Sequence, residues 1–226
     1  MTISAYSWGH LVLAAVQALV WSSNNTSASA VRAIALLLVA TSVYDNGLIG
    51  LGAALGEGPL LTSLSTVRFY THWAFVPFLL VPATTFLLRA NVLRSQGWLA
   101  ATWAVAAVLS VVEVQEGFFS EEGLVLEPME FRGMLRMVSA SEKGLPVVTI
   151  AVNLSLLAVG LRLRRDTAIL FAGSLAALVG NAVPSSLVGP LLGCLGEALL
   201  YYSIIHKDKL FFSAPEEEVV MKKKDR

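Results

Sequence analysis

Long apolar runs separated by short polar segments dominate the pattern of this chain. About seven of these runs approach the roughly 20 residues that a helix needs to cross a bilayer. They are 3–22, 30–55, 67–88, 98–118, 145–161, 167–183 and 187–205. The pattern therefore predicts an all-α fold, a single polytopic transmembrane bundle over residues 1–206. An alternative has six spans, with the last two runs forming a re-entrant pair.

The first run, 3–22, is the weakest of these spans. It has no basic segment before it, and His10 and Gln17 interrupt its apolar residues. A cleaved signal peptide normally has a basic start and an uninterrupted apolar core. We therefore interpret this run as a genuine first span. The run 67–88 carries Pro77 and Pro82, which predict a kink in that helix.

Positive charges fall in alternate gaps between the runs, which predicts the orientation of the chain. Cationic loops resist translocation and stay in the cytosol. The gaps assigned to the cytosol hold Arg32, Arg89, Arg94, Arg162, Arg164, Arg165, Lys207, Lys209, Lys222, Lys223, Lys224 and Arg226. The opposite gaps hold Arg68, Arg132, Arg136 and Lys143. The N-terminus is therefore expected outside, or in a lumen, and the C-terminus in the cytosol.

Composition supports a membrane protein and argues against several other classes. Apolar residues make up 56% of the chain and charged residues only 14%, whereas about a quarter of a soluble domain is charged. The formal net charge is zero, so the basic loops are better explained as topology signals than as a nucleic-acid surface. The single cysteine, Cys194, excludes an intrachain disulfide.

The connection 119–143 lies outside in this topology. Its apolar residues share one helical face: Phe131, Met134, Leu135 and Val138. Arg132 and Arg136 share another face, so the pattern predicts a short helix in the membrane interface. A solvated loop with chance periodicity is the alternative.

Residues 207–226 are expected to form a charged cytosolic tail. Lys223 and Lys224 stand third and fourth from the end of the chain. This spacing matches the dilysine retrieval signal of endoplasmic-reticulum membrane proteins and favours that location. A lysine-rich stop-transfer tail explains the same residues without a signal.

Polar groups from several spans fall at one level near the outer boundary of the hydrocarbon. Ionisable groups in spans are costly and tend to face a bundle interior or a wet cavity. We predict acid–base roles for Asp45, His72, Glu113 and Glu116. We predict ligand-binding roles for Tyr44, Asn46, Arg68, Glu142, Lys143, Asn181 and Glu197.

Two interpretations of this polar level stay open. A carboxylate beside a histidine in a partly dry pocket suits proton transfer near neutral pH. The same groups equally suit interhelical ion pairs that order the bundle, such as Arg68 with Glu113 or Asp45. Glu197 lies deeper, either as a proton relay or as a neutral carboxyl bonded to a partner. Candidate partners for it are His10, Gln17 and Asn153.

Other chemistries find little support in the sequence. The three histidines, His10, His72 and His206, show neither HxxxH nor HExxH spacing, so no metal site is expected. A GxSxG motif is absent, and the last span has no lysine to attach retinal. No cofactor is indicated.

The sequence therefore predicts a multi-pass membrane protein with an ionisable pocket at its outer boundary. The first hypothesis is a membrane-embedded enzyme that acts on a lipid or another amphiphile by acid–base chemistry. The alternatives are a proton-coupled small-molecule transporter and a non-catalytic lipid-binding or assembly protein. Membrane lipids and a small amphiphile are the expected partners, whereas nucleic acid is not. Reaction type and oligomeric state are not indicated.

Overall fold

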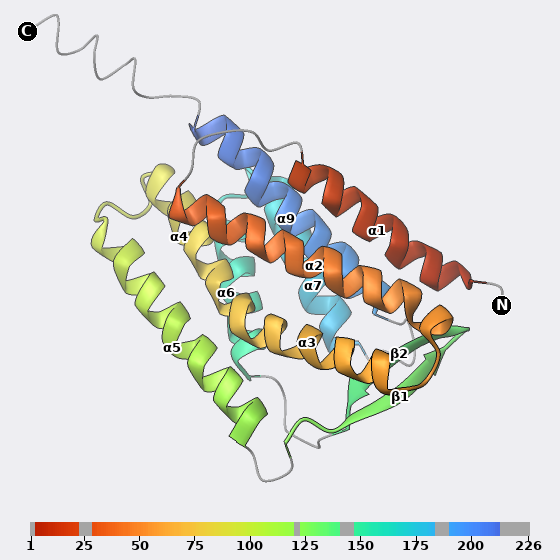
Figure 1. The fold of residues 1–226 in the computed structure, drawn as a ribbon. Helices are drawn as coiled ribbons and strands as arrows, with labels where there is room; N and C mark the ends of the chain where they lie inside the picture. The colour runs from red at the N-terminus through yellow and green to blue at the C-terminus, as the bar shows by residue number, and fades with distance from the viewer. Residues whose placement is uncertain (1–2, 23–28, 120–122, 141–146, 184–189, 213–226) are drawn as a thin grey trace, which may run out of the picture.

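The fold is mainly α-helical, as a computed structural model shows for residues 3–22, 29–119, 123–140, 147–183 and 190–212 (Figure 1). Within these residues, three helical segments are long and apolar enough to cross a membrane. They are Ala30–Leu55, Pro59–Arg89 and Gly97–Gly117. The fold therefore fits a membrane protein. The number of about seven spans stays a prediction, because the remaining apolar stretches Val147–Arg162, Ala168–Ala182 and Leu191–His206 are shorter.

Helices α1 (Ala5–Ser22) and α2 (Ala30–Leu55) pack against each other (Figure 1). The bounds of α2 agree with the predicted run 30–55. The helix begins where the Ser29 hydroxyl accepts a hydrogen bond of 3.2 Å from the Arg32 backbone N–H. It ends at Gly56, whose φ of 72° favours a residue without a side chain.

The next helical segment is interrupted, as its prolines predict. Helix α3 (Pro59–Phe75) is followed by a 3₁₀ turn, η1 (Val76–Leu79), and by α4 (Leu80–Arg89). The 3₁₀ turn contains Pro77, which has no N–H for an α-helical hydrogen bond. The segment begins earlier than the predicted 67, because Pro59 occupies the first helical turn, where proline is well tolerated.

Helix α5 (Gly97–Phe119) packs on α3 and α4 at the edge of the fold (Figure 1). Much of its apolar surface is exposed, for example Val105, Val108 and Val111. Ala106 and Gly117 are buried. An apolar helix that exposes such a surface suits contact with lipid.

The last three described helices are α6 (Val147–Arg162), α7 (Ala168–Ala182) and α9 (Leu191–Phe212). Helices α7 and α9 approach closely through glycines. A Cβ atom on Gly180 would overlap the backbone of Gly193, and one on Gly196 would overlap that of Ala177. Small residues allow helix backbones this close an approach.

The connection between α5 and α6 contains a β-hairpin, and the predicted interfacial helix is wrong. Strands β1 (Leu126–Phe131) and β2 (Met134–Ser139) pair antiparallel, with Phe131 opposite Met134. The two turn residues, Arg132 and Gly133, have φ values of 48° and 77°. A two-residue turn of this conformation matches the twist of the strands it joins. The apolar residues that fit one face of a helix therefore lie on strands in the structure.

The hairpin packs on α1, α2 and α3. Phe131 and Met134 contact Ile49, and Met137 packs with Leu48 and Leu61. Tyr6 of α1 meets the Phe131 ring edge-on, with 4.9 Å between ring centroids. The hairpin thus covers the C-terminal end of α2 and the N-terminal end of α3.

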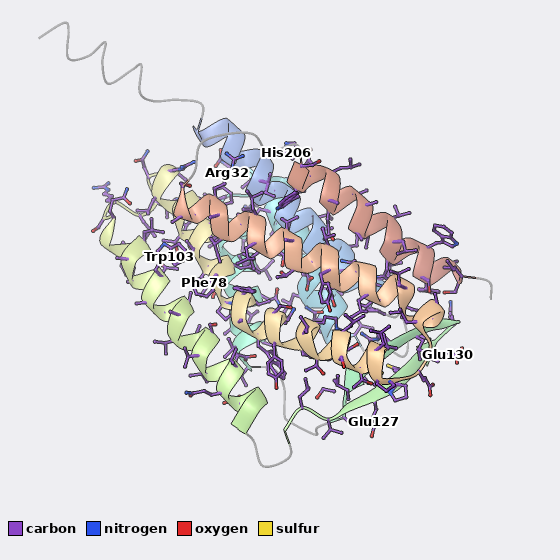
Figure 2. The ribbon with its side chains drawn as sticks, viewed as in Figure 1. Arg32, Phe78, Trp103, Glu127, Glu130 and His206 are labelled. Carbon is purple, nitrogen blue, oxygen red and sulfur yellow. The ribbon has the colours of Figure 1, made fainter. Side chains whose placement is uncertain are left out.

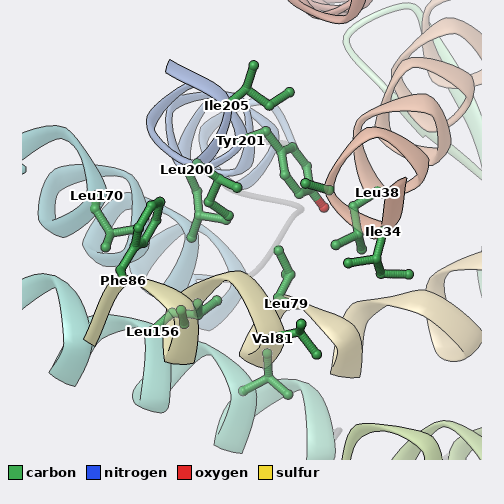
Figure 3. Close-up of a cluster of buried hydrophobic side chains, with 14 of the residues drawn as sticks. Ile34, Leu38, Leu79, Val81, Phe86, Leu156, Leu170, Leu200, Tyr201 and Ile205 are labelled. Carbon is green, nitrogen blue, oxygen red and sulfur yellow. The ribbon is translucent and has the colours of Figure 1, made fainter. Parts of the chain in front are cut away.

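A separate apolar core joins α2, α4, α6, α7 and α9 (Figure 3). Its fully buried members include Leu38, Val81, Leu156, Leu170 and Leu200. Arg32 and His206 mark one end of the fold, and Glu127 and Glu130 mark the opposite end (Figure 2). Arg32, assigned to the cytosol, and Glu127 and Glu130 of the connection assigned to the outside therefore lie at different ends.

Candidate functional site

The site is centred on an ion pair between α2 and α3. Arg68 Nε lies 3.3 Å from Asp45 Oδ1, and the two side chains are 9% and 25% exposed. Arg68 Nη2 also donates a hydrogen bond of 2.9 Å to the Met137 carbonyl oxygen of β2. One guanidinium therefore links α2, α3 and the hairpin. Of the two ion pairs considered for Arg68, the structure contains the one with Asp45.

Tyr44 and His72 flank this pair. The Tyr44 hydroxyl donates a hydrogen bond of 2.8 Å to the Leu64 carbonyl oxygen, which fixes α2 against α3. His72 lies one turn after Arg68 on α3, so the two share a helix face. The imidazole is within electrostatic range of both Asp45 and Arg68. The structure thus pairs Asp45 with Arg68 and places His72 one turn further along α3. The acid–base role of these residues stays a prediction.

Asn46 belongs to a second polar network, between α1 and α2. Its Oδ1 accepts a hydrogen bond from His10 Nδ1 at 2.8 Å, because an amide oxygen can only accept. Its Nδ2 donates to Gln17 Oε1 at 3.3 Å, and Gln17 Nε2 donates to Ser42 Oγ at 2.8 Å. All four residues are buried. Asn46 therefore faces α1 and not the Asp45–Arg68 pair.

Neither His10 nor Gln17 bonds to Glu197, contrary to the sequence hypothesis. His10 Nδ1 and the Gln17 amide bond within the Asn46 network, and His10 Nε2 has no hydrogen-bond partner. Glu197 lies on α9, within electrostatic range of Asp45. Asn181 lies at the C-terminal end of α7, and its Oδ1 packs close to Gly193 of α9. It belongs to the α7–α9 contact. Glu142 and Lys143 lie outside the described residues.

The two acids of α5 stay apart from the ion pair. Glu113 and Glu116 lie one turn apart and within electrostatic range of each other. Neither binds Arg68, whose partners are Asp45 and the Met137 carbonyl. This end of α5 is held instead by Gly117, where an added Cβ atom would overlap the ring of Trp73 on α3.

Arg136 is a candidate site residue that the sequence reasoning missed. It lies half-buried on β2, within electrostatic range of Arg68 and Asp45. Its Nε is buried without a hydrogen-bond partner, and its Nη2 lies 3.7 Å from Met129 Sδ. Burial, reinforced by the like charge of Arg68, lowers the pKa of this guanidinium. An unpartnered buried donor of this kind favours an additional polar or anionic partner.

The strand period was the signal that would have identified Arg136. Side chains two apart on a strand share a face, so Arg136 lies on the face of Met134, which is fully buried. The helical period instead grouped Arg136 with Arg132. In the structure, Arg132 is exposed in the hairpin turn and lies over the Tyr6 ring, 5.6 Å from its centroid.

An apolar cavity of about 120 Å³ lies between α1, α2 and α9. Its lining includes Leu13, Val39 and Leu199, together with Tyr201 and Tyr202. Gln17 also lines it, and this side chain bonds to Asn46. The cavity therefore adjoins the second polar network and has the chemistry to hold an apolar chain.

Within the described residues, no group of three or more His, Cys, Asp or Glu side chains is placed to hold a metal ion. No protein-family model, curated protein or solved structure matches this chain, and its function is inferred from the site alone.

Proposed function

We propose that this protein is a multi-pass membrane protein that acts on an amphiphile by acid–base chemistry, in which Asp45 and His72 take a proton from the amphiphile and return one to it. The observation that carries this proposal is the Asp45–Arg68 ion pair, with His72 one helical turn after Arg68 on α3. Ionisable groups in a membrane-embedded bundle are costly, and they usually mark a functional site. A carboxylate and an imidazole are suitable partners for proton transfer near neutral pH.

An anionic head group is the class of ligand that best fits this centre. Arg68 is neutralised by Asp45, whereas Arg136 has no carboxylate partner among the described residues. A phosphate or carboxylate on the ligand would supply the missing acceptor through a charge-assisted hydrogen bond. In this proposal Arg136 holds the head group, and Arg68 fixes Asp45. Glu113 and Glu116 take no direct part.

The orientation is part of the same proposal. The hairpin end, marked by Glu127 and Glu130, faces the outside or a lumen, and the end marked by Arg32 and His206 faces the cytosol (Figure 2). The separation of these residues supports this orientation, because cationic segments stay in the cytosol. Residence in the endoplasmic reticulum rests on the Lys223–Lys224 spacing, which lies outside the described residues.

Mass spectrometry of lipids that copurify with the detergent-extracted protein tests the ligand. We expect a retained anionic amphiphile in the wild type and its loss in Arg136→Gln. The matched control is Arg132→Gln, because Arg132 is exposed on the same hairpin. Equal lipid profiles in all three proteins would overturn the proposed ligand class.

A second experiment tests the chemistry. The retained amphiphile is added back to delipidated wild type, His72→Gln and Asp45→Asn, and its conversion is followed by mass spectrometry. We expect turnover in the wild type only, with His72→Gln still retaining the amphiphile. Full turnover in His72→Gln, or none in the wild type, would contradict acid–base catalysis and leave a lipid-binding protein.

A further inference from the structure

The turn between α6 and α7 forms an open depression of about 490 Å³ on the surface. It is lined by Ala158, Leu161, Arg162, Arg164, Arg165 and Asp166. Sites for small molecules commonly have about 300–1,000 Å³. The depression is therefore large enough for a head group, and it lies far along the chain from the Asp45 site.

The backbone that forms this depression is fixed. Leu163 is buried, and its carbonyl oxygen accepts hydrogen bonds from the N–H groups of Asp166 at 2.9 Å and Thr167 at 2.8 Å. The Thr167 and Ser203 hydroxyls bond to each other at 2.9 Å, which attaches the turn to α9. A turn anchored in this way presents its arginines with little ordering cost on binding.

The side chains around the depression carry uncompensated positive charge. Arg162, Arg164, Arg165 and Asp166 are all exposed, and none of their side chains forms a hydrogen bond or ion pair with the described part of the chain. Three guanidiniums and one carboxylate leave a net charge of +2 (3 − 1) at this turn. Guanidiniums bind phosphate oxygens well, because their N–H groups form a planar fork.

An apolar surface adjoins the arginines. Ala158 and Leu161 line the depression, and Leu154 and Leu161 are 50% and 46% exposed along α6. Ile169, in the first turn of α7, is 44% exposed. A basic depression beside an exposed apolar strip has the chemistry of an anionic lipid, with its head group at the arginines and its acyl chain along α6.

We propose that the α6–α7 turn is a binding site for an anionic lipid with a phosphomonoester head group, such as phosphatidic acid. A phosphomonoester carries about −1.5 to −2 charges at pH 7, close to the charge of the turn. The lipid lies in the leaflet at the end of the bundle that holds Ser203 and His206. This site is distinct from the Asp45 centre and does not depend on its proposed chemistry.

Native mass spectrometry of the full-length protein in detergent tests this site. The protein is titrated with phosphatidic acid, with phosphatidylcholine and with inorganic phosphate. We expect phosphatidic acid to bind with one-to-one stoichiometry, and its affinity to fall about tenfold or more in Arg164→Gln/Arg165→Gln. Arg94→Gln is the matched control, since Arg94 is an exposed arginine of another loop. It should bind phosphatidic acid as the wild type does.

Three outcomes would overturn the lipid site. The first is equal affinity in wild type and the double variant, and the second is an equal loss in Arg94→Gln. The third is inorganic phosphate that binds as tightly as phosphatidic acid, which would assign the site to a soluble anion. Protease access to the C-terminal tail in sealed vesicles checks that both variants keep the wild-type orientation.

Discussion

Arg68 is the residue on which the arrangement of the hairpin end depends. Its guanidinium bonds both to Asp45 of α2 and to a carbonyl oxygen of β2. One side chain of α3 therefore connects that helix to two other elements. A buried ion pair is a weak source of net stability, but removing one partner leaves an uncompensated charge. The pair therefore orders these elements more than it adds to total stability.

A double-mutant cycle tests this role. We expect Asp45→Asn to lower the free energy of unfolding by about 3–5 kcal/mol, because Arg68 then keeps a buried charge without a counter-ion. Asp45→Asn combined with Arg68→Met should recover part of that loss. Thermal unfolding in detergent gives the comparison. Strictly additive losses in the double variant would mean that the two side chains do not stabilise each other.

The sequence predicted some of these residues for a physical reason. Charged groups are rare in apolar helices, and Arg68 and His72 have one-turn spacing, so the sequence singles out Asp45, Arg68 and His72 as candidates. The direction of Asn46 was not predictable, since consecutive helical residues point about 100° apart and the position of α1 decides which of them is buried against it. The sequence suggests Glu113 and Glu116 of α5 as site residues only because they lie at the same depth in the membrane. Depth does not indicate whether a side chain faces the ion pair or points away from it.

At the scale of elements, α2 was the most predictable and the hairpin the least. A serine cap precedes the apolar run of α2 and a glycine follows it, so its bounds of Ala30–Leu55 follow from local signals. The hairpin residues also fit a helical face, and the two periods cannot be separated over so short a segment. The two-residue turn at Arg132 and Gly133 favours the hairpin over the helix.

The hairpin reaches its position because Gly52 has no side chain. A Cβ atom there would overlap the Leu135 carbonyl, whereas one on Gly47 of the same helix meets nothing within 4 Å. We expect Gly52→Ala to displace the hairpin and to destabilise the fold by about 1–3 kcal/mol. Gly47→Ala, the matched control, should stabilise α2 by about 0.5–1 kcal/mol.

Limited proteolysis within 123–140, together with thermal unfolding, distinguishes these two variants. Faster cleavage in Gly52→Ala and none in Gly47→Ala would support the close contact between α2 and β2. Equal protection of the hairpin in both proteins would mean that this contact does not hold it in place.

For the whole molecule, sequence and structure agree on a helical membrane protein and leave the number of spans to experiment. Helix α6 has 16 residues, and at about 1.5 Å per residue it rises about 24 Å, less than the roughly 30 Å of a hydrocarbon core. Hydropathy measures the length of an apolar run, whereas crossing the membrane depends on the length of the helix within that run. The charge pattern is a more robust signal of orientation, because it does not depend on where each helix begins and ends.

We infer that the Asp45 centre lies beneath the hairpin at the non-cytosolic end of a membrane-spanning bundle. Labelling with a membrane-impermeant thiol reagent in sealed vesicles of known orientation, in a Cys194→Ala background, tests it directly. Glu127→Cys should react only from the non-cytosolic side, and Arg94→Cys only from the cytosolic side. Labelling of both cysteines from the same side would contradict this orientation of the bundle.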